Sequence, residues 1–282
     1  MLVELAVGDA YGAGFEYSSG LTVRLHNSAR YYLKHPKHNI QPGCYTDDTQ
    51  MTLAIVELLL SGQRWTPENL AERFVEVFWR DPREGYAGKF YEFLKTVRSG
   101  EEFLARVQPT SDKSGAAMRA TPLGVLRTIG EVVEKCRVQA AVTHNTTDGI
   151  NAALAAALMT HYFLYNLGPK EQLPDFLQGQ VEGQWISPWF GKVEGKGWMS
   201  VRAAITAVVR NTRLSELLKD CVEFTGDVDT VATIALAAAS CSPEYEHDLP
   251  ASLVLELENG AYGREYLAAL DQRLFEHFGL RA

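Results

Sequence analysis

Apolar side chains recur at spacings of three and four residues through most of the chain, which is the period of an amphipathic helix. One such stripe runs from Met51 to Leu59. Thr66 and Pro67 have the character of an N-cap and a first helical residue, and an apolar stripe follows them. Further helices are predicted around residues 90–97 and over residues 116–133, 150–165, 201–209 and 214–224. Segments with the two-residue alternation of strands are scarce, so the pattern predicts an all-α fold, a compact helical bundle whose loops at one end carry the site.

The pattern breaks down between residues 168 and 197, where prolines, glycines and tryptophans gather. This segment is predicted to be a long loop. Trp185 and Trp189, with Trp198 just beyond, have two interpretations: they stack on a nucleotide-like substrate, or they anchor the loop to the bundle. Anchoring is favoured, because buried aromatic side chains usually serve packing.

Two short acidic motifs each stand where an apolar helical stripe begins, at residues 45–49 and 226–230. Taken singly, each motif is explained by helix capping, in which a Thr or Asp oxygen accepts an unpaired backbone N–H and the helix dipole favours the negative charge. Taken together, the motifs supply more carboxylates than capping requires, namely those of Asp47, Asp48, Asp227 and Asp229.

Four carboxylates brought into one place would repel one another and raise their own pKa values unless cations neutralised them. The available ligand atoms are carboxylate and hydroxyl oxygens, including those of Thr46 and Thr230, with no thiolate among them. Such a hard-oxygen set favours Mg²⁺ or Mn²⁺ over Zn²⁺. If the two motifs meet in space, the sequence therefore predicts a divalent metal site.

Five motifs follow one another along nearly the whole chain: Gly8-Asp9-Ala10-Tyr11-Gly12-Ala13 with Glu16, then Thr46-Asp47-Asp48-Thr49, then Gly115-Ala116-Ala117-Met118-Arg119 with Pro122-Leu123-Gly124, then Thr143-His144, and Gly226-Asp227-Val228-Asp229-Thr230. In this order they resemble the ADP-ribosylglycohydrolase family, which includes the enzyme that reactivates ADP-ribosylated dinitrogenase reductase. Each motif alone would be weak, and the specificity lies in their order. The resemblance implies the same all-α fold.

The resemblance also implies a dinuclear centre of two divalent cations, Mg²⁺ or Mn²⁺. By analogy with the family, the metal ligands are expected to be Thr46, Asp47, Asp48, Asp227, Asp229 and Thr230. Glu16 or Asp47 is expected to act as general base, although an exposed loop glutamate is the simpler interpretation of Glu16. Asp9 is expected to support the site structurally.

Substrate contacts are expected from the family resemblance at Ser114, Gly115, Ala116, Met118 and His144. Backbone N–H groups at the helix start near Ser114 would face a pyrophosphate, although the same residues also describe an ordinary helix entry. Many family members have Asn at the position of Ser114. A lone histidine such as His144 is more often a structural hydrogen-bonding residue, and the resemblance shifts the interpretation to substrate contact.

Composition agrees with one domain over residues 1–282, because no linker-like stretch divides the chain. The net charge of −8 is spread among interspersed acidic and basic residues, so non-specific binding of nucleic acid or anionic lipid is not expected. The four cysteines form no Cys-x-x-Cys pair and no secretory leader precedes them, which favours reduced thiols in a cytoplasmic protein. No apolar run approaches the length of a membrane span.

The expected function is therefore a metal-dependent ADP-ribosylhydrolase, in which water attacks C1″ of the distal ribose and releases ADP-ribose from a protein or small-molecule acceptor. An arginine linkage is the preferred acceptor on family frequency, with serine, ester and nucleic-acid linkages left open. Two other classes stay open: a non-catalytic ADP-ribose-binding relative and a metal-dependent phosphohydrolase.

Overall fold

The computed structural model describes residues 1–280. Within them lie fifteen α-helices, two short 3-10 helices and four isolated β-bridges, with no β-strand, which confirms the all-α prediction. No helix among these residues is long and apolar enough to cross a membrane. The helices are α1 (Leu2–Ala13), α2 (Gly20–His26), α3 (Asp47–Leu60), α4 (Pro67–Arg80), α5 (Gly88–Leu94), α6 (Gly100–Arg106), α7 (Gly115–Met118), η1 (Thr121–Val125), α8 (Ile129–Ala141), α9 (Thr147–Leu164), η2 (Lys170–Gln172), α10 (Leu173–Gln180), α11 (Gly197–Arg210), α12 (Leu214–Glu223), α13 (Val228–Ala239), α14 (Ala251–Glu256) and α15 (Arg264–Phe278).

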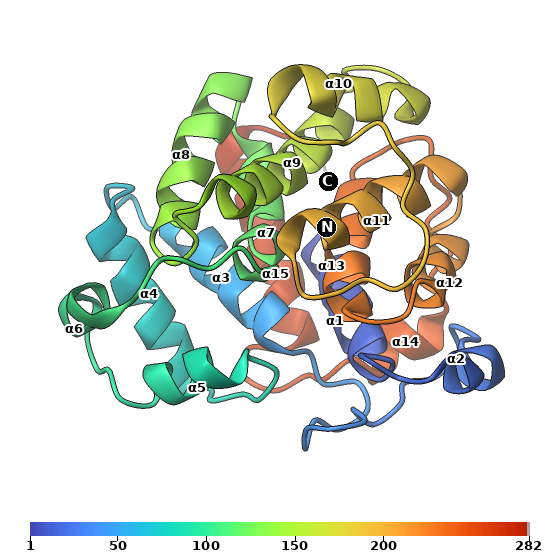
Figure 1. Cartoon of the computed structure of the whole chain (residues 1–282), viewed down its shortest axis with the longest axis horizontal. Coiled ribbons are helices and arrows are strands. Elements are labelled where there is room, and N and C mark those ends of the chain that lie inside the picture. The colour runs from blue at the N-terminus through green and yellow to red at the C-terminus, as the bar shows by residue number, and fades with distance from the viewer. Residues whose placement is uncertain (281–282) are drawn as a thin grey trace.

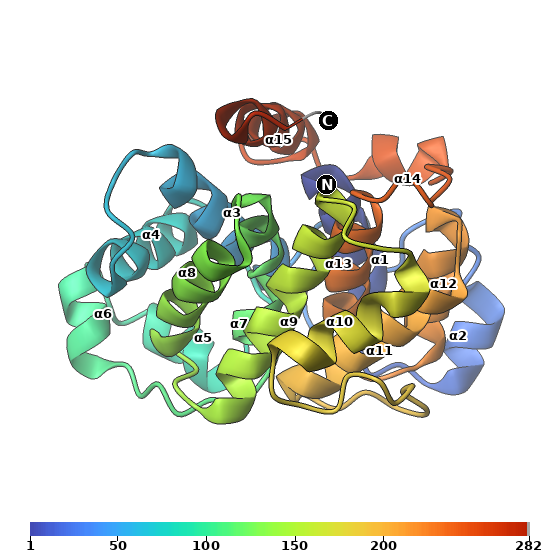
Figure 2. The same ribbon diagram turned by 90° about the horizontal axis from the view of Figure 1, so that it is seen from above.

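Helices α1, α9, α11 and α13 form the centre of the bundle (Figure 1). All twelve residues of α13 are buried, and α9 is buried from residue 152 to residue 163. Both helices are rich in alanine, whose small side chain lets helix backbones approach closely. Around this centre, α3 to α6 and α8 lie on one flank and α2 and α12 on the other, while α15 lies on the face opposite α10 and α11 (Figure 2).

Helix α1 crosses α13 at very short range, and two glycines make this possible. A Cβ on Gly8 would lie 2.6 Å from the carbonyl oxygen of Ala232, and a Cβ on Gly12 would lie 2.4 Å from Cα of Asp229. Since the earlier glycine meets the later residue of α13, the two helices run antiparallel. The C-terminal end of α1 is thereby brought against the N-terminal end of α13.

The helix predicted over residues 116–133 is wrong as a single element. Helix α7 ends at Met118, the 3-10 helix η1 follows, and α8 begins only at Ile129. Pro122 lacks an N–H and restricts the residue before it, which interrupts the α-helical pattern. Thr128 then starts α8 through a capping box with Glu131.

The prediction of a structureless loop over residues 168–197 is also wrong in part, because it missed α10. The tryptophans do anchor this segment. Trp185 is only 2% exposed and its indole N–H donates to the carbonyl of Val181, while the ring centroids of Trp189 and Trp198 lie 5.7 Å apart. Packing, the favoured interpretation, accounts for these contacts.

Candidate metal centre

Four helix ends meet at one end of the bundle: the C-terminal end of α1 and the N-terminal ends of α3, α7 and α13. The two acidic motifs occupy two of these ends, with Asp47 and Asp48 in the first turn of α3 and Asp229 in the first turn of α13. Asp227 is the N-cap residue of α13 and Thr46 is that of α3. Helix packing therefore brings together the two acidic motifs that the sequence analysis had identified as candidate metal-binding segments.

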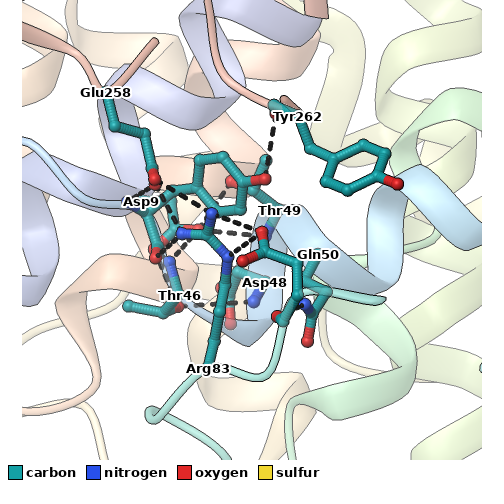
Figure 3. A network of polar contacts seen from close by, with 10 residues as sticks. Asp9, Thr46, Asp48, Thr49, Gln50, Arg83, Glu258 and Tyr262 are labelled. Atoms are coloured by element: carbon teal, nitrogen blue, oxygen red, sulfur yellow. Dashed lines mark hydrogen bonds and ion pairs between the residues drawn. The ribbon is translucent and has the colours of Figure 1, made fainter. Parts of the chain in front are cut away.

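Asp9, in α1, fixes the position of the first acidic motif through hydrogen bonds. Its fully buried carboxylate accepts hydrogen bonds from the backbone N–H of Thr46 at 3.0 Å and of Thr49 at 2.9 Å, and from their hydroxyls at 2.8 and 2.6 Å. Figure 3 shows Thr46, Asp48 and Thr49 gathered around it. These bonds occupy the lone pairs of Asp9, so its contacts are those of a structural support.

Arg83 and Glu258 form hydrogen bonds with the residue that precedes Thr46, and the sequence analysis had not predicted this role for either residue. Arg83 donates to the carbonyl of Tyr45 at 3.0 Å and to Glu258 at 2.9 Å, while Glu258 accepts the backbone N–H of Tyr45 at 2.9 Å (Figure 3). The guanidinium also lies 3.6 Å from the centroid of the Tyr45 ring. A planar fork of this kind fixes both distance and orientation, so the backbone entering α3 is held rigidly.

Glu16, in the loop after α1, joins the second acidic motif. One carboxylate oxygen from each of Glu16, Asp227 and Asp229 lies within 4.8 Å of the other two. Asp227 also accepts a hydrogen bond from the hydroxyl of Ser200, at 3.1 Å. Glu16 is thus a member of the acidic cluster, which the simpler interpretation of an isolated loop glutamate does not explain.

The carboxyl groups of the two motifs act strongly on one another. Burial, and then the charges of Glu16, Asp227 and Asp48, raise the pKa of Asp229 well above its ordinary value. Burial and neighbouring carboxylates raise the pKa values of Asp47 and Asp48 in the same way, and burial with Glu16 raises the pKa of Asp227 to about 6. The two motifs lie side by side at helix ends that pack against each other, but Asp47 and Asp48 are not among the three groups whose ligand atoms lie within 4.8 Å of one another.

The donor atoms fit a hard divalent cation. Oδ2 of Asp48 and Oδ1 of Asp229 are buried and have no hydrogen-bond partner among residues 1–280, a costly state for a carboxylate oxygen. Thr46 and Thr230, 1% and 2% exposed, add hydroxyl oxygens at the same helix ends. Carboxylate and hydroxyl oxygens are the ligands that Mg²⁺ and Mn²⁺ prefer. Among residues 1–280, Glu16, Asp227 and Asp229 are the group whose ligand atoms approach closely enough to share an ion.

The raised pKa values predict how the stability of the metal-free protein depends on pH. A carboxyl whose folded pKa exceeds its unfolded value stabilises the fold below the unfolded pKa, and this contribution is lost as pH rises through the folded pKa. For Asp227, with a pKa of about 6 against 3.8, the loss amounts to on the order of 3 kcal/mol. In chelator, ionisation of Asp227 should therefore destabilise the protein between about pH 4 and about pH 7, and ionisation of Asp47, Asp48 and Asp229 acts in the same direction.

Thermal unfolding in chelator and in millimolar Mg²⁺ or Mn²⁺, followed by scanning calorimetry across this pH range, checks the prediction. The rise in Tm caused by the cation should be larger on the neutral side of the range than on the acidic side. A rise that is independent of pH, or larger in acid, would contradict it.

A second network of hydrogen-bonded polar side chains lies beside α7. Arg119 is 1% exposed and has no carboxylate partner; it donates to Gln139 at 2.7 Å and to the Thr143 hydroxyl at 2.8 Å. Burial lowers its pKa to about 9. The Thr143 hydroxyl, which accepts the hydrogen bond from Arg119, lies 2.7 Å from Nδ1 of His144. Among the described residues, Nδ1 is the acceptor to which this hydroxyl donates its own proton. The network thus places the ring proton of His144 on Nε2.

His144 is uncharged at neutral pH, because burial and then the nearby Arg119 lower its pKa to about 3. Its ring faces α7: a Cβ on Gly115 would lie 3.1 Å from Cε1 and 3.3 Å from Nε2 of His144. The two segments that the resemblance connected with substrate, around Gly115 and His144, are therefore in contact. Arg119 and Thr143 belong to the resembling motifs, but their hydrogen-bonding role could be recognised only in three dimensions.

The other residues predicted to contact substrate differ in their exposure to solvent. Ser114 and Gly115 keep exposed surface, and Ser114 lies close enough to Asp227 for its side chain to favour the ionised carboxylate. Ala116 is fully buried and Met118 is 4% exposed. The carbonyl of Ala116 already accepts a hydrogen bond from Gln139. Contact through the side chains of Ala116 and Met118 stays a prediction, and both side chains lie in the core.

The fold and the site define a class: an all-α protein in which helix N-termini gather buried carboxylates suited to divalent cations, beside a wall made by α7 and a neutral histidine. The model of the ADP-ribosylglycohydrolase family matches residues 1–282. The chain belongs to that family.

Named relatives agree with this membership. The chain is 29% identical over 191 residues to ADP-ribosylhydrolase ARH3 of Xenopus tropicalis, a match that covers 64% of this chain and 54% of the frog protein. It is 26% identical over 271 residues to the ADP-ribosyl-[dinitrogen reductase] glycohydrolase of Rhodospirillum rubrum, covering 90% and 87% of the two chains. This chain thus spans about half the length of the frog relative and most of the bacterial one.

A solved structure described as an ADP-ribosylglycohydrolase-related protein complex superposes on this chain with a TM-score of 0.74. The two share 25% sequence identity, and the match covers 98% of this chain and 95% of that one. The helical arrangement described above is therefore shared with a member of the same group of proteins.

Proposed function

We propose that this protein is a metal-dependent ADP-ribosylhydrolase that releases ADP-ribose from a modified acceptor. The observation that carries the proposal is the cluster of Glu16, Asp227 and Asp229 beside the first acidic motif, with an unpartnered buried oxygen on Asp48 and another on Asp229. A cluster of this kind is unfavourable without cations. Membership of the family supplies the substrate class, because its named relatives are described as ADP-ribosylhydrolase and ADP-ribosyl glycohydrolase.

The proposed cofactor is a pair of divalent cations, Mg²⁺ or Mn²⁺. When bound, such ions polarise ribose hydroxyls and lower the pKa of water. The residues proposed to hold them are Thr46, Asp47, Asp48, Asp227, Asp229 and Thr230, with Glu16 adjoining the second motif.

The proposed substrate position runs from the acidic cluster along α7 towards His144. The exposed surface of Ser114 and Gly115 offers backbone N–H groups at the start of α7, where an anionic pyrophosphate is favoured. Nε2–H of His144 is a donor suited to a ribose hydroxyl. Because His144 stays neutral, this contact adds no charge that would change over the physiological range of pH.

The proposed reaction is hydrolysis at C1″ of the distal ribose. Glu16 or Asp47 takes a proton from the attacking water, which adds to C1″ as the bond to the acceptor breaks. The surrounding carboxylates favour the positive charge that an oxocarbenium-like transition state carries at the ribose. Burial raises the pKa of Asp47, and a desolvated carboxylate of this kind is suited to proton transfer.

For the acceptor, we propose an arginine linkage as an extension from the bacterial members of the family. The relative that this chain matches over most of its length is named for dinitrogen reductase. No residue of the described site selects the acceptor by itself, so the linkage is decided by experiment.

Mass-spectrometric product analysis on arginine-linked, serine-linked and acetylated ADP-ribose, with and without chelator, tests the proposal. We expect free ADP-ribose from the arginine-linked substrate and loss of the product when the cation is removed. Turnover of the serine or ester conjugate alone would overturn the linkage. Release of AMP or inorganic phosphate would indicate a phosphohydrolase, and ADP-ribose binding without turnover in saturating Mg²⁺ would indicate a non-catalytic relative.

A further inference from the structure

Glu16 owes its position to a residue that neither the motifs nor the family order had singled out. Nε2 of His35 lies 2.6 Å from Oε2 of Glu16, and His35 is only 4% exposed. Among the described residues, this is the one hydrogen bond that the Glu16 carboxylate receives from the protein. Glu16 itself stands on a loop after α1, and no helix holds it in place.

The direction of this hydrogen bond is fixed by the other side of the imidazole ring. Nδ1 of His35 accepts the backbone N–H groups of Lys37 and His38, each at 3.0 Å. An Nδ1 that accepts two N–H groups carries no proton, so the ring proton is on Nε2 and points at Glu16. His35 therefore acts as the hydrogen-bond donor, and the Glu16 carboxylate as the acceptor.

The segment that carries His35 is itself tied down. The backbone N–H of His35 donates to the carbonyl of Ile40 at 3.2 Å, and the N–H of Asn39 donates to Oε2 of Glu84 at 2.8 Å. The ammonium of Lys37 lies 4.6 Å above the ring of Tyr17, the residue next to Glu16. The imidazole thus stands on a fixed backbone, which is what a group needs in order to orient another.

Electrostatics explains why Glu16 needs such a partner. Its carboxylate faces those of Asp227 and Asp229 in one cluster, and like charges at this range push a flexible side chain towards solvent. The N–H group of His35 counteracts that push by holding the Glu16 carboxylate, and it adds no carboxylate ligand to the cluster. Outer hydrogen-bond partners of this kind commonly set the position of metal ligands and catalytic bases.

We propose that His35 is a positioning residue that keeps Glu16 turned into the acidic cluster. The inference deepens the proposed function, since it concerns the same site. It predicts that removing the Nε2 donor mimics part of the loss of Glu16, both in divalent-cation binding and in kcat, while the substrate KM changes little.

Three variants separate positioning from loop integrity. In His35→Asn the side-chain oxygen replaces Nδ1 as acceptor for the two N–H groups, so the loop stays tied while the donor to Glu16 is lost. In His35→Gln the amide N–H group reaches the place of Nε2 and restores the donor. His26→Asn is the matched control, because the His26 ring pairs with the Tyr31 hydroxyl at 3.1 Å and not with Glu16.

The measurements are Mn²⁺ affinity by titration calorimetry and steady-state kinetics on arginine-linked ADP-ribose. His35→Asn should lower both Mn²⁺ affinity and kcat by about 10- to 100-fold, as outer-partner removal usually does. His35→Gln should recover most of this loss, and His26→Asn should match the unmodified protein. The proposal would be overturned if His35→Gln lost as much Mn²⁺ affinity and kcat as His35→Asn, or if His35→Asn changed neither quantity.

A double-mutant cycle with Glu16→Gln completes the test. If His35 acts through Glu16, the effect of His35→Asn on Mn²⁺ affinity should disappear in the Glu16→Gln background. Additive effects would refute the inference. The calorimetric cycle does not depend on turnover. A protein that fails to release ADP-ribose would therefore refute the proposed function, while the Mn²⁺ affinities would still decide the role of His35.

Discussion

Asp229→Asn should abolish ADP-ribose release and, at the same time, make the metal-free protein more stable. Oδ1 of Asp229 is buried without a hydrogen-bond partner, and burial and four neighbouring carboxylates raise the pKa of the group. A neutral amide of the same shape removes this repulsion but also removes a carboxylate ligand. We expect kcat/KM to fall by about 1,000-fold or more, the effect of several kcal/mol of lost transition-state stabilisation.

Calorimetry and kinetics together check this result. In chelator at neutral pH the Tm of Asp229→Asn should exceed that of the unmodified protein by a few degrees, while millimolar Mn²⁺ should raise it much less. Asp175→Asn is the matched control: Asp175 is exposed on α10, so its loss should change neither property. An active Asp229→Asn variant, or one that still binds Mn²⁺ with undiminished affinity, would refute the role assigned to Asp229.

Gly12→Ala should damage both the fold and the site, although it adds a single methyl group. The new Cβ would lie 2.4 Å from Cα and 2.7 Å from the backbone nitrogen of Asp229, and backbone atoms of a buried helix cannot move aside cheaply. Overpacking of this kind costs about 1–3 kcal/mol. Because the clash is at Asp229 itself, the first turn of α13, which carries proposed metal ligands, would shift, and a displacement near 1 Å costs about 100-fold in activity.

Gly179→Ala provides the control for this prediction. Gly179 also lies within a helix, α10, but a Cβ added there would meet nothing within 4 Å. That substitution should stabilise the protein by about 0.5–1 kcal/mol through helix propensity, with no change in activity. Chemical denaturation and kcat/KM measured on both variants distinguish a clash at α13 from a general effect of replacing glycine. Equal behaviour of the two variants would contradict the close approach of α1 and α13.

Much of the helical framework could be predicted because it depends on local pattern. The stripe from Met51 to Leu59 and the cap at Thr66 correspond to α3 and α4, whose N-cap side chains accept hydrogen bonds as expected. The errors also have local causes. Pro122 divides a segment whose apolar content had suggested one helix, and the eight residues of α10 are too few for a clear period.

The candidate site divides in the same way. Asp47, Asp48, Asp227 and Asp229 were evident, because several carboxylates beside helix starts exceed what capping needs. His35, Arg83 and Glu258 carried no such signal. Each acts through a partner whose distance along the chain, from 19 residues for His35 and Glu16 to 175 for Arg83 and Glu258, follows no helical or strand period.

By itself, the amino-acid sequence determined the helical class of this protein, the residues with metal-binding chemistry and their family order, since these depend on residue type and short-range spacing. The tertiary structure alone decided that the first acidic motif lies beside the cluster of Glu16, Asp227 and Asp229, that Arg83 holds this motif, and that His35 faces Glu16. The physical reason is the packing of α1 on α13 through Gly8 and Gly12: this crossing sets which distant helix ends meet, and no local pattern encodes it.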